Sequence, residues 1–247
     1  MSVRKIKLTI QYDGFAYCGW QVQPGFKTIQ QTLNQALFSL VGREVTVHGA
    51  SRTDSGVSAL GQVGLIELVN SPVPTKNFPK AINDRLPPEI IVTDAVEVDK
   101  KFDLLGDVKS KLYRYTVCNQ LHRSVMDVRH CWHVHKKLNE NAMKEAAALV
   151  EGTKDFKSFA SAADRRKSTI RTVFRCEVEK QGGWFYIDVE GDSFLYNMVR
   201  NIVGALVEVG LGRWQPEKIT GIIEAKDRTA AGQIAPPQGL CLMWIKY

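Results

Sequence analysis

The chain lacks the features of a membrane-spanning or secreted protein. Its longest apolar stretches, such as residues 202–209, are interrupted by Gly204 and Glu208. They fall well short of the roughly 20 residues that a bilayer span requires. The N-terminus alternates polar and apolar residues instead of offering a continuous signal-peptide core. We therefore expect a protein that does not cross a membrane and is mature from its first residue.

Cysteine is scarce, and phosphate-binding motifs are absent. The five cysteines are scattered, odd in number and without a CxxC spacing, which argues against a disulfide framework or a zinc site and for a reducing cytoplasm. In the segment 130–135, His133 and His135 share one strand face, but no carboxylate or cysteine lies at ligand spacing, so a plain strand is favoured. Neither a GxxxxGKS nor a GxGxxG motif occurs.

The overall composition is that of a globular protein with an excess of basic residues. With 44% hydrophobic and 24% charged residues, the 247 residues suffice for one large domain or two small ones. The net charge of +7 is uneven, because residues 1–105 carry +1 and residues 106–247 carry +6. A basic excess favours polyanionic partners, although many metabolic enzymes are equally basic.

Hydrophobic periodicity predicts the order βαββαβ twice. In the first half we expect strands at 5–12, 44–50, 62–68 and 90–98, with helices at 29–41 and 76–85. In the second half we expect strands at 111–117, 172–179, 184–190 and 240–246, with helices from Asn139 to Gly152, from Phe194 to Val209 and from Pro216.

This order predicts an α+β fold of two ferredoxin-like halves. The halves are expected to span residues 1–105 and 106–247. No repeat is visible at the level of single residues, so the duplication is one of topology.

Two segments could carry chemistry through charged side chains. The apolar helix 194–209 includes Arg200, whose guanidinium needs an anion opposite it, a need that Glu208, another structural acid or water could also meet. The small-residue loop 49–61 holds Arg52 and Asp54. The residue types of this loop are typical of an ordinary turn, unless the loop lies in a cleft.

Two further segments offer aromatic and basic side chains. Tyr113 and Tyr115 share one strand face and serve either as core or as a platform on which a base stacks. The run 164–167, with Arg165 and Arg166, is a solvated surface unless it lies near a cleft, where it would contact phosphates.

Taken in order along the chain, several motifs resemble the tRNA pseudouridine synthase A family, and the match runs nearly end to end. The matching segments are residues 12–21 (YDGFAYCGWQ), 52–57 (RTDSGV), 113–115 (YRY), 155–159 (DFKSF), 194–204 and 236–240 (PPQGL). The resemblance implies a cofactor-free and metal-free isomerase that converts uridine to pseudouridine at positions 38, 39 and 40 of the tRNA anticodon stem-loop. It also implies a homodimer whose protomers each have two ferredoxin-like halves around a continuous, mostly antiparallel sheet with a central cleft.

The resemblance also implies roles for single residues. Asp54 matches the catalytic aspartate, and Arg52 the arginine of the same motif. Tyr113 matches the active-site tyrosine, Arg200 the arginine that pairs with the aspartate, and Leu240 an apolar residue of the base pocket. We add Arg165 and Arg166 as RNA-binding residues. The sequence departs from the family at Ser51, Ser55, Ser58 and Leu105. These departures bear on RNA binding and on which tRNA position is modified.

The chemistry fits these residue types. An ionised carboxylate can attack C1′ or take a proton from C2′, and the sequence does not choose between the two. An opposite charge from Arg200 would favour the ionised form of Asp54 that burial disfavours. Two rivals are a non-catalytic RNA-binding module, although no RNP1 aromatic pattern occurs, and a small-molecule enzyme that uses the Asp54 loop.

Overall fold

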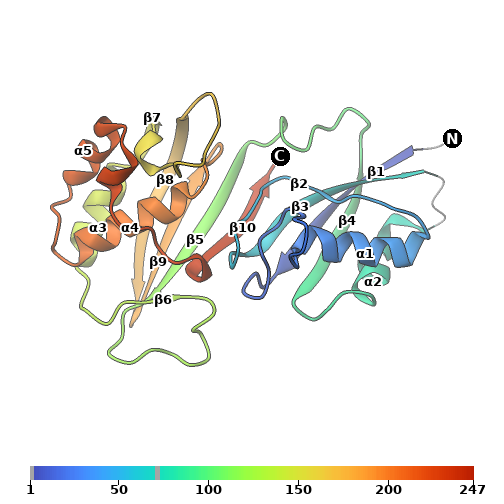
Figure 1. The fold of residues 1–247 in the computed structure, drawn as a ribbon, viewed down its shortest axis with the longest axis horizontal. Helices are drawn as coiled ribbons and strands as arrows, with labels where there is room; N and C mark the ends of the chain where they lie inside the picture. The colour runs from blue at the N-terminus through green and yellow to red at the C-terminus, as the bar shows by residue number, and fades with distance from the viewer. Residues whose placement is uncertain (1–2, 70–72) are drawn as a thin grey trace. The chain divides into compact units, whose positions relative to one another are not determined.

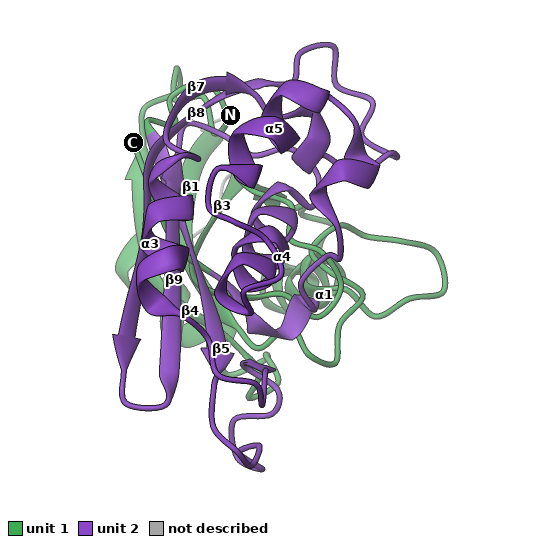
Figure 2. Ribbon diagram, turned by 90° about the vertical axis from the view of Figure 1, so that its left-hand side faces the viewer, with its two compact units in different colours: residues 1–109, 242–247 green, residues 110–241 purple. Residues whose placement is uncertain are grey.

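The computed structural model describes residues 3–69 and 73–247, so Met1 and Ser2 of the N-terminal segment lie outside the described residues. The chain forms two compact units, residues 1–109 with 242–247 and residues 110–241 (Figure 2). Each unit combines helices with mostly antiparallel strands, which confirms the α+β class. Within the described part of the chain, no helix has the length and apolar character to span a bilayer.

The first unit is a sheet with two helices (Figure 1). Its strand order is β4-β1-β3-β10, and β2 also pairs with β3. The pairs β1–β3, β1–β4 and β2–β3 are antiparallel. The elements are β1 (Val3–Tyr12), α1 (Ile29–Val41), β2 (His48–Gly49), β3 (Ser58–Val69), the 3-10 turn η1 (Thr75–Asn77), α2 (Phe78–Asn83), β4 (Ile90–Val98) and the end of β10 (Leu240–Lys246).

Local sequence signals account for the first strand and helix of this unit. Alternate residues of β1 are buried, as its hydrophobic alternation predicts. The side chain of Thr28 caps α1 by accepting a hydrogen bond from the Gln31 N–H, and Gly42 ends the helix in the left-handed conformation at φ 71°. Both predicted boundaries of α1 are therefore confirmed.

The predicted strand 44–50 is wrong except for its last part, β2. The Val47 N–H donates to Asn34 Oδ1 at 2.9 Å, and the Val47 carbonyl accepts from Gln30 Nε2 at 2.9 Å. Because side chains of α1 take both backbone groups of Val47, this residue has none left for a strand ladder. The neighbouring strand β3 starts at Ser58, four residues before the predicted start at Gln62.

The last residues of the chain complete the first unit. The Lys109 N–H donates to the Lys246 carbonyl at 2.9 Å, and the Tyr247 hydroxyl donates to the Leu104 carbonyl at 2.9 Å. The rings of Phe102 and Tyr247 lie 5.0 Å apart. The expected division into 1–105 and 106–247 does not include this return of the chain.

The second unit has a sheet of order β5-β9-β8-β7 with antiparallel neighbours, and β6 adds to β5 in parallel. Helices α3, α4 and α5 belong to this unit (Figure 1). The elements are β5 (Ser110–Cys118), β6 (Trp132–His133), α3 (Glu140–Ala148), β7 (Gly152–Asp155), η2 (Lys157–Phe159), β8 (Ile170–Gln181), β9 (Trp184–Gly191), α4 (Met198–Gly210), α5 (Lys218–Ala225), η3 (Arg228–Ala231) and η4 (Pro237–Gly239).

The two faces of this sheet differ in polarity. Tyr113 and Tyr115 of β5 stand opposite Val189 and Ile187 of β9, and all four are buried. The other face carries charges, such as Arg114, which makes a two-pronged salt bridge of 2.7 and 2.8 Å with Asp188. The alternation of β5 therefore sends its tyrosines into the core of the unit and its arginine to the other side.

The long predicted helix begins later than expected. α4 starts at Met198 and not at Phe194, because Asn197 adopts the left-handed conformation with φ 64°. The Tyr196 N–H donates to Asp164 Oδ2 at 2.7 Å, and its carbonyl accepts from the Ser161 N–H at 2.8 Å. The loop before β8 thus takes the hydrogen bonds that a first helical turn would use.

Three further differences concern element ends. α3 stops at Ala148, earlier than the predicted end at Gly152, and Gly152 instead opens the unpredicted strand β7. The predicted helix 76–85 is the 3-10 turn η1 followed by the short α2. The plain strand expected at 130–135 is reduced to the two residues of β6.

Candidate active site

Asp54 lies in the first unit on the loop between β2 and β3, where it is half-buried. Backbone hydrogen bonds clamp this loop to the segment after β1: Trp20 N–H donates to the Thr53 carbonyl at 3.1 Å, and Gly56 N–H donates to the Tyr17 carbonyl at 3.2 Å. A tight turn closes at Asp54 itself, whose carbonyl accepts from the Val57 N–H at 3.1 Å. The backbone on both sides of the carboxylate is therefore fixed.

A buried polar network secures the start of the same loop. Gln62 of β3 is fully buried, and its side-chain amide both donates to the Ser51 carbonyl at 2.7 Å and accepts from the Ser51 N–H at 3.2 Å. The Tyr12 hydroxyl lies 2.8 Å from the Thr53 hydroxyl and accepts from Gln62 Nε2 at 3.3 Å. Such satisfied networks rigidify the backbone that carries them.

Two glycines allow the segment after β1 to approach the Asp54 loop. A Cβ on Gly14 would lie 2.0 Å from the Val57 carbonyl oxygen, so no other residue fits there without moving the backbone. Gly19 has φ 81°, and a Cβ there would lie 2.7 Å from the Thr53 carbonyl oxygen. The glycines of the YDGFAYCGWQ motif thus hold the Asp54 loop in place.

The departures from the family pattern have local structural roles in this chain. Ser55 Oγ donates to the Tyr17 carbonyl at 3.2 Å, and Ser58 Oγ accepts from the Gly14 N–H at 3.1 Å. Gln62 binds both backbone groups of Ser51. Leu105 is 66% exposed. The serines therefore add to the clamp on the loop.

Arg52 is exposed on the same loop, two residues before Asp54. Since Thr53 between them is buried, the loop presents the arginine to solvent while the half-buried aspartate stays closer to the body of the first unit.

Tyr113 lies in the second unit on β5, where it is 6% exposed. The ring of Phe194 stands against it edge-to-face, at 5.3 Å between centroids and 88° between planes. Phe194 also reaches Gly191, where an added Cβ would lie 3.1 Å from the phenylalanine ring. The turn between β9 and α4 therefore holds the tyrosine in one orientation.

The second tyrosine of the strand, Tyr115, is a core residue. It is fully buried, its hydroxyl donates to the Pro236 carbonyl at 2.7 Å, and Gly239 approaches its ring so closely that a Cβ would lie 2.5 Å away. Burial raises the pKa of the Tyr115 phenol well above its usual range, against the opposing charge of Arg200. Tyr115 therefore stays a neutral hydrogen-bond donor, as expected for one of the two tyrosines.

Arg200 lies in the first turn of α4 and is half-buried. Its Nε donates to the Ala235 carbonyl at 2.8 Å, and its Nη1 donates to Asn197 Oδ1 at 3.0 Å. The Ala235 N–H returns a bond to the Arg200 carbonyl at 3.1 Å. These bonds orient the guanidinium. Glu208, the alternative partner, binds Arg213 instead at 2.8 Å.

Leu240 and the basic loop complete the predicted set. Leu240 is buried and directly follows η4, whose Gly239 packs on Tyr115. Arg166 donates from Nη1 to the Phe194 carbonyl at 2.8 Å and to Asp164 at 3.2 Å, while Arg165 is exposed. The second unit thus brings Arg166, Phe194 and Tyr113 together.

Sequence reasoning missed three residues that shape these sites. Gln62 and Phe194 receive no role from the sequence, although Phe194 begins the quoted segment 194–204 and Gln62 begins a predicted strand. Lys111 precedes Tyr113 by two residues on the same face of β5, and burial, helped by the charge of Arg166, lowers its pKa to about 8. The alternation of β5 puts Lys111 on the face of Tyr113, and across the strands Lys111 stands opposite Gly191 of β9.

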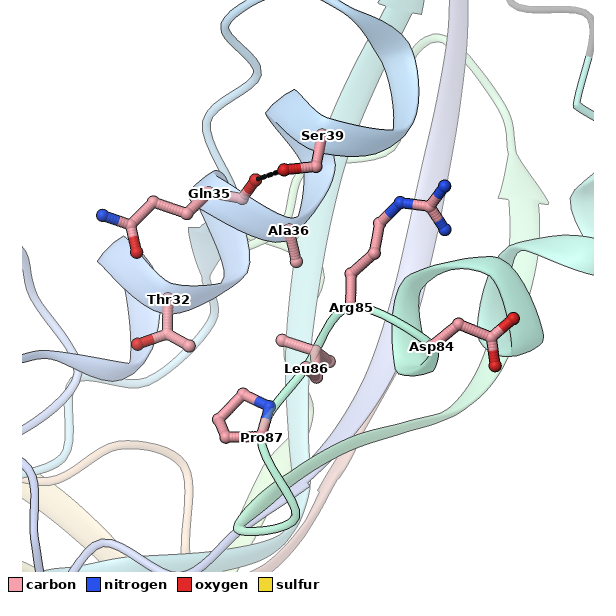
Figure 3. A pocket seen from close by; sticks show the side chains of 8 residues that line it. All are labelled: Thr32, Gln35, Ala36, Ser39, Asp84, Arg85, Leu86 and Pro87. Atoms are coloured by element: carbon pink, nitrogen blue, oxygen red, sulfur yellow. Dashed lines mark hydrogen bonds between the residues drawn. The ribbon is translucent and has the colours of Figure 1, made fainter.

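A shallow hollow of about 480 Å³ lies elsewhere in the first unit, between α1 and the chain after α2 (Figure 3). Ser39 on its wall donates to the Gln35 carbonyl at 3.1 Å. None of the predicted site residues lines it; its walls are Thr32, Gln35, Ala36, Ser39, Asp84, Arg85, Leu86 and Pro87. Among residues 3–69 and 73–247, no group of three or more His, Cys, Asp or Glu side chains could hold a metal ion.

Comparison with known proteins defines the class. The family model described as tRNA pseudouridine synthase matches residues 8–104 and 146–247, which include Asp54, Arg200 and Leu240, while Tyr113 lies between the two matched stretches. The chain is thus an isomerase of the pseudouridine synthase class, which isomerises uridine in tRNA.

Similar proteins narrow this class further. The chain is 43% identical over 99% of its length to all of the tRNA pseudouridine synthase A of Geotalea daltonii. It is 44% identical over 99% of its length to all of that of Ruminiclostridium cellulolyticum, and 41% identical over the same share to all of that of Thermoanaerobacter sp.. The chain belongs to the tRNA pseudouridine synthase A family.

Proposed function

We propose that this isomerase acts on uridines 38, 39 and 40 of the tRNA anticodon stem-loop, with Asp54 as its catalytic carboxylate. The observation that carries this proposal is the clamped loop around Asp54, in which hydrogen bonds from Trp20, Gly56 and Val57 fix the backbone while the aspartate remains half-buried. A carboxylate must be held rigidly to act on one atom of a large, mobile substrate.

Asp54 acts on the ribose of the target nucleotide. The reaction breaks the C1′–N1 bond, turns the base and joins C1′ to C5, after which C5 loses a proton and N1 carries one. The carboxylate either attacks C1′ or takes the proton from C2′. Nothing is added or removed overall, so the reaction requires no cofactor or metal. The site must keep water away while the base is detached, unlike that of a hydrolytic glycosidase.

The other predicted residues act on the base and its surroundings. Tyr113, held by Phe194, stacks on the flipped uracil and is positioned to accept the C5 proton, although a phenol with an unperturbed pKa of about 10 needs help to do so. Leu240 lines the base pocket. Arg52 occupies the gap left by the extruded nucleotide or binds its phosphate, and Arg165 and Arg166 bind the RNA backbone.

Arg200 pairs with Asp54 in this proposal. Its guanidinium is already oriented by Ala235 and Asn197, and a permanently charged group opposite the carboxylate would keep it ionised. The proposal therefore includes a cleft between two ferredoxin-like halves that share a continuous sheet. In the first unit β4, β1 and β3 are neighbours in that order and β2 also pairs with β3, which supports a ferredoxin-like half. We further propose a homodimer and a cytoplasmic location.

The central test is mass mapping of pseudouridine in anticodon stem-loops after incubation with the purified protein. We expect new pseudouridine at one or more of positions 38, 39 and 40. Product only elsewhere in the tRNA would contradict the proposed positions, and no product in any tRNA tested would contradict the assignment to this substrate.

The substitution Asp54→Asn tests the catalytic residue. The amide keeps the shape of the side chain but loses its charge, so turnover should fall by several orders of magnitude while tRNA affinity stays within about threefold. Asp94→Asn, on the exposed side of β4, is the matched control and should leave turnover unchanged. Substantial turnover by Asp54→Asn would exclude Asp54 as the catalytic residue. It would favour the interpretation of the loop as an ordinary turn.

A further inference from the structure

The turn between β9 and α4 places two aromatic residues in different surroundings. Phe194 is half-buried, and its ring stands edge-to-face against Tyr113 at 5.3 Å between the centroids. Leu195 is buried, whereas Tyr196 is 44% exposed. The turn therefore supports the tyrosine of the candidate active site with one aromatic residue and presents the next one to solvent.

The backbone of Tyr196 is held on both sides. Its N–H donates to Asp164 Oδ2 at 2.7 Å, and its carbonyl accepts from the Ser161 N–H at 2.8 Å. The Asp164 side chain is 5% exposed and also accepts from the Arg166 N–H at 3.0 Å. Hydrogen bonds to a carboxylate are stronger than those between neutral groups. Tyr196 therefore stands on a fixed backbone, and a tyrosine side chain loses little conformational freedom when a ligand binds it.

The exposure of Tyr196 differs from that of the other exposed aromatic residue in a strand of this unit. A single exposed apolar side chain is common in itself. Phe174 of β8 is 52% exposed, and the register shift between Val173 and Arg175 in the β8–β9 pair accounts for its position. Among residues 3–69 and 73–247, the side chain of Tyr196 makes neither a hydrogen bond nor a ring contact. A planar ligand can therefore reach its ring.

An aromatic ring at this place suits a nucleobase. Extrusion of a target uridine leaves the neighbouring base without one of its stacking partners, and an aromatic side chain can take that place. Phe194 and Tyr196 are two residues apart, so their Cα atoms lie at most about 7 Å from each other. Since the ring of Phe194 packs on Tyr113, a base stacked on Tyr196 would belong to a nucleotide close to the one at Tyr113.

We propose that Tyr196 is a stacking platform for a base of the substrate RNA that neighbours the target uridine. The inference rests on the proposed function and adds one RNA-binding residue to it. Stacking of this kind accepts any base, because every base has a π face. Tyr196 therefore contributes affinity and holds the RNA strand beside the extruded nucleotide without reading its sequence.

The first test measures binding of an anticodon stem-loop RNA by fluorescence anisotropy across a series of salt concentrations. Tyr196→Leu should weaken binding by about fivefold or more, while Tyr196→Phe, which keeps the ring, should bind within about twofold of the wild type. The slope of log affinity against log salt should stay unchanged in both variants, because a stacked base releases no counterions. Phe174→Leu removes a similarly exposed ring from the same unit and is the matched control, with no expected change. Circular dichroism confirms that each variant is folded.

The second test locates the contact directly. An iodinated uridine placed beside the target position forms a photochemical cross-link with an aromatic side chain that is stacked on it, and peptide mass spectrometry identifies the cross-linked residue. We expect a cross-link at Tyr196 in the wild type and at the same position in Tyr196→Phe. Tyr196→Leu should give none there, because the leucine side chain offers no ring.

The two proposals fail in different ways. Wild-type affinity in Tyr196→Leu, or an equal loss of affinity in Tyr196→Phe and Tyr196→Leu, would overturn the stacking platform. If the wild-type enzyme is active on the same stem-loop, the proposed function stands in either case. An RNA that binds with the expected dependence on the ring at position 196 but gains no pseudouridine would support the stacking platform and contradict the proposed function.

Discussion

At the scale of single residues, Lys111 shows how a charge can be kept in an unfavourable place. Burial and the neighbouring Arg166 lower its pKa from 10.5 to about 8, which means that the folded state holds the lysine proton less tightly than the unfolded chain does. The lysine therefore costs stability at neutral pH. A residue that destabilises its own fold is expected where a ligand needs it.

The sign of this effect gives a prediction about stability. Below about pH 8 the lysine is protonated in both the folded and the unfolded state, and its full cost to stability is present. Between about pH 8 and about pH 10.5 the folded protein has lost this proton, and the cost disappears as the unfolded chain loses it too. Lys111→Met should thus raise the free energy of unfolding by about 1 to 3 kcal/mol at pH 7, and the difference should shrink toward pH 10.

Urea unfolding of the two proteins at several pH values measures this difference. Lys137→Met, at an exposed position before α3, controls for general effects of removing a lysine. A wild-type protein that is more stable than Lys111→Met at pH 7 would show that the contacts of the lysine outweigh the cost of its burial, contrary to the sign of its pKa shift.

At the scale of elements, the position at which α4 begins determines how Arg200 is oriented. Because Asn197 breaks the helix, Arg200 lies in the first turn, where the Ala235 carbonyl and Asn197 Oδ1 orient its guanidinium. A helix that began at Phe194 would have placed Arg200 in its second turn, and Asn197 would not have been available in this conformation.

Arg200→Met is expected to impair turnover more than folding. If Arg200 pairs with Asp54 as proposed, loss of its positive charge favours the protonated carboxylate, so kcat/KM should fall by about 100-fold or more at neutral pH. As the pH is lowered, the remaining activity should begin to decline at a higher pH than that of the wild type. Arg200→Lys, which keeps the charge but not both oriented bonds, should retain more activity and the wild-type pH range.

The pH–rate profiles of the wild type, Arg200→Met and Arg200→Lys distinguish an effect on the carboxylate from an effect on folding. A uniform loss of activity at every pH, matched by an equal loss of thermal stability, would show that Arg200 supports only the local packing of α4 on the segment at Ala235.

At the scale of the whole molecule, the two compact units are not two consecutive pieces of sequence. The chain leaves the first unit at Lys109 and returns to it at Leu242. A Cβ on Gly61 of β3 would lie 2.4 Å from the Met243 carbonyl oxygen, so the returning strand packs directly on β3. The first unit is therefore incomplete until the last residues have been synthesised.

Removal of residues 242–247 should destabilise the first unit selectively. The truncation uncovers β3 and removes the bonds from Lys109 and Tyr247 as well as the ring contact of Phe102. We expect amide protons of β1, β3 and β4 to exchange at least tenfold faster than in the full chain, with smaller changes in β8 and β9. Tyr247→Phe, which removes a single hydroxyl, is the control with little expected change. Equal loss of protection in all five strands would contradict this view.

The sequence by itself determined the elements whose signals are local. The alternation of β1, the cap at Thr28, the stop at Gly42 and the motifs that reveal the family all depend on neighbours in the chain. The bounds of β4 and β10 likewise follow from short runs of residues between turn signals.

Only the tertiary structure decided what depends on partners distant in sequence. Val47 fails to join a strand because Asn34 and Gln30 occupy its backbone, and α4 starts late because the loop around Asp164 takes the bonds of Tyr196. The lowered pKa of Lys111 depends on burial and then on Arg166, which lies 55 residues further along the chain. Hydrogen-bond competition and burial act through space, and no window of sequence contains both members of such a pair.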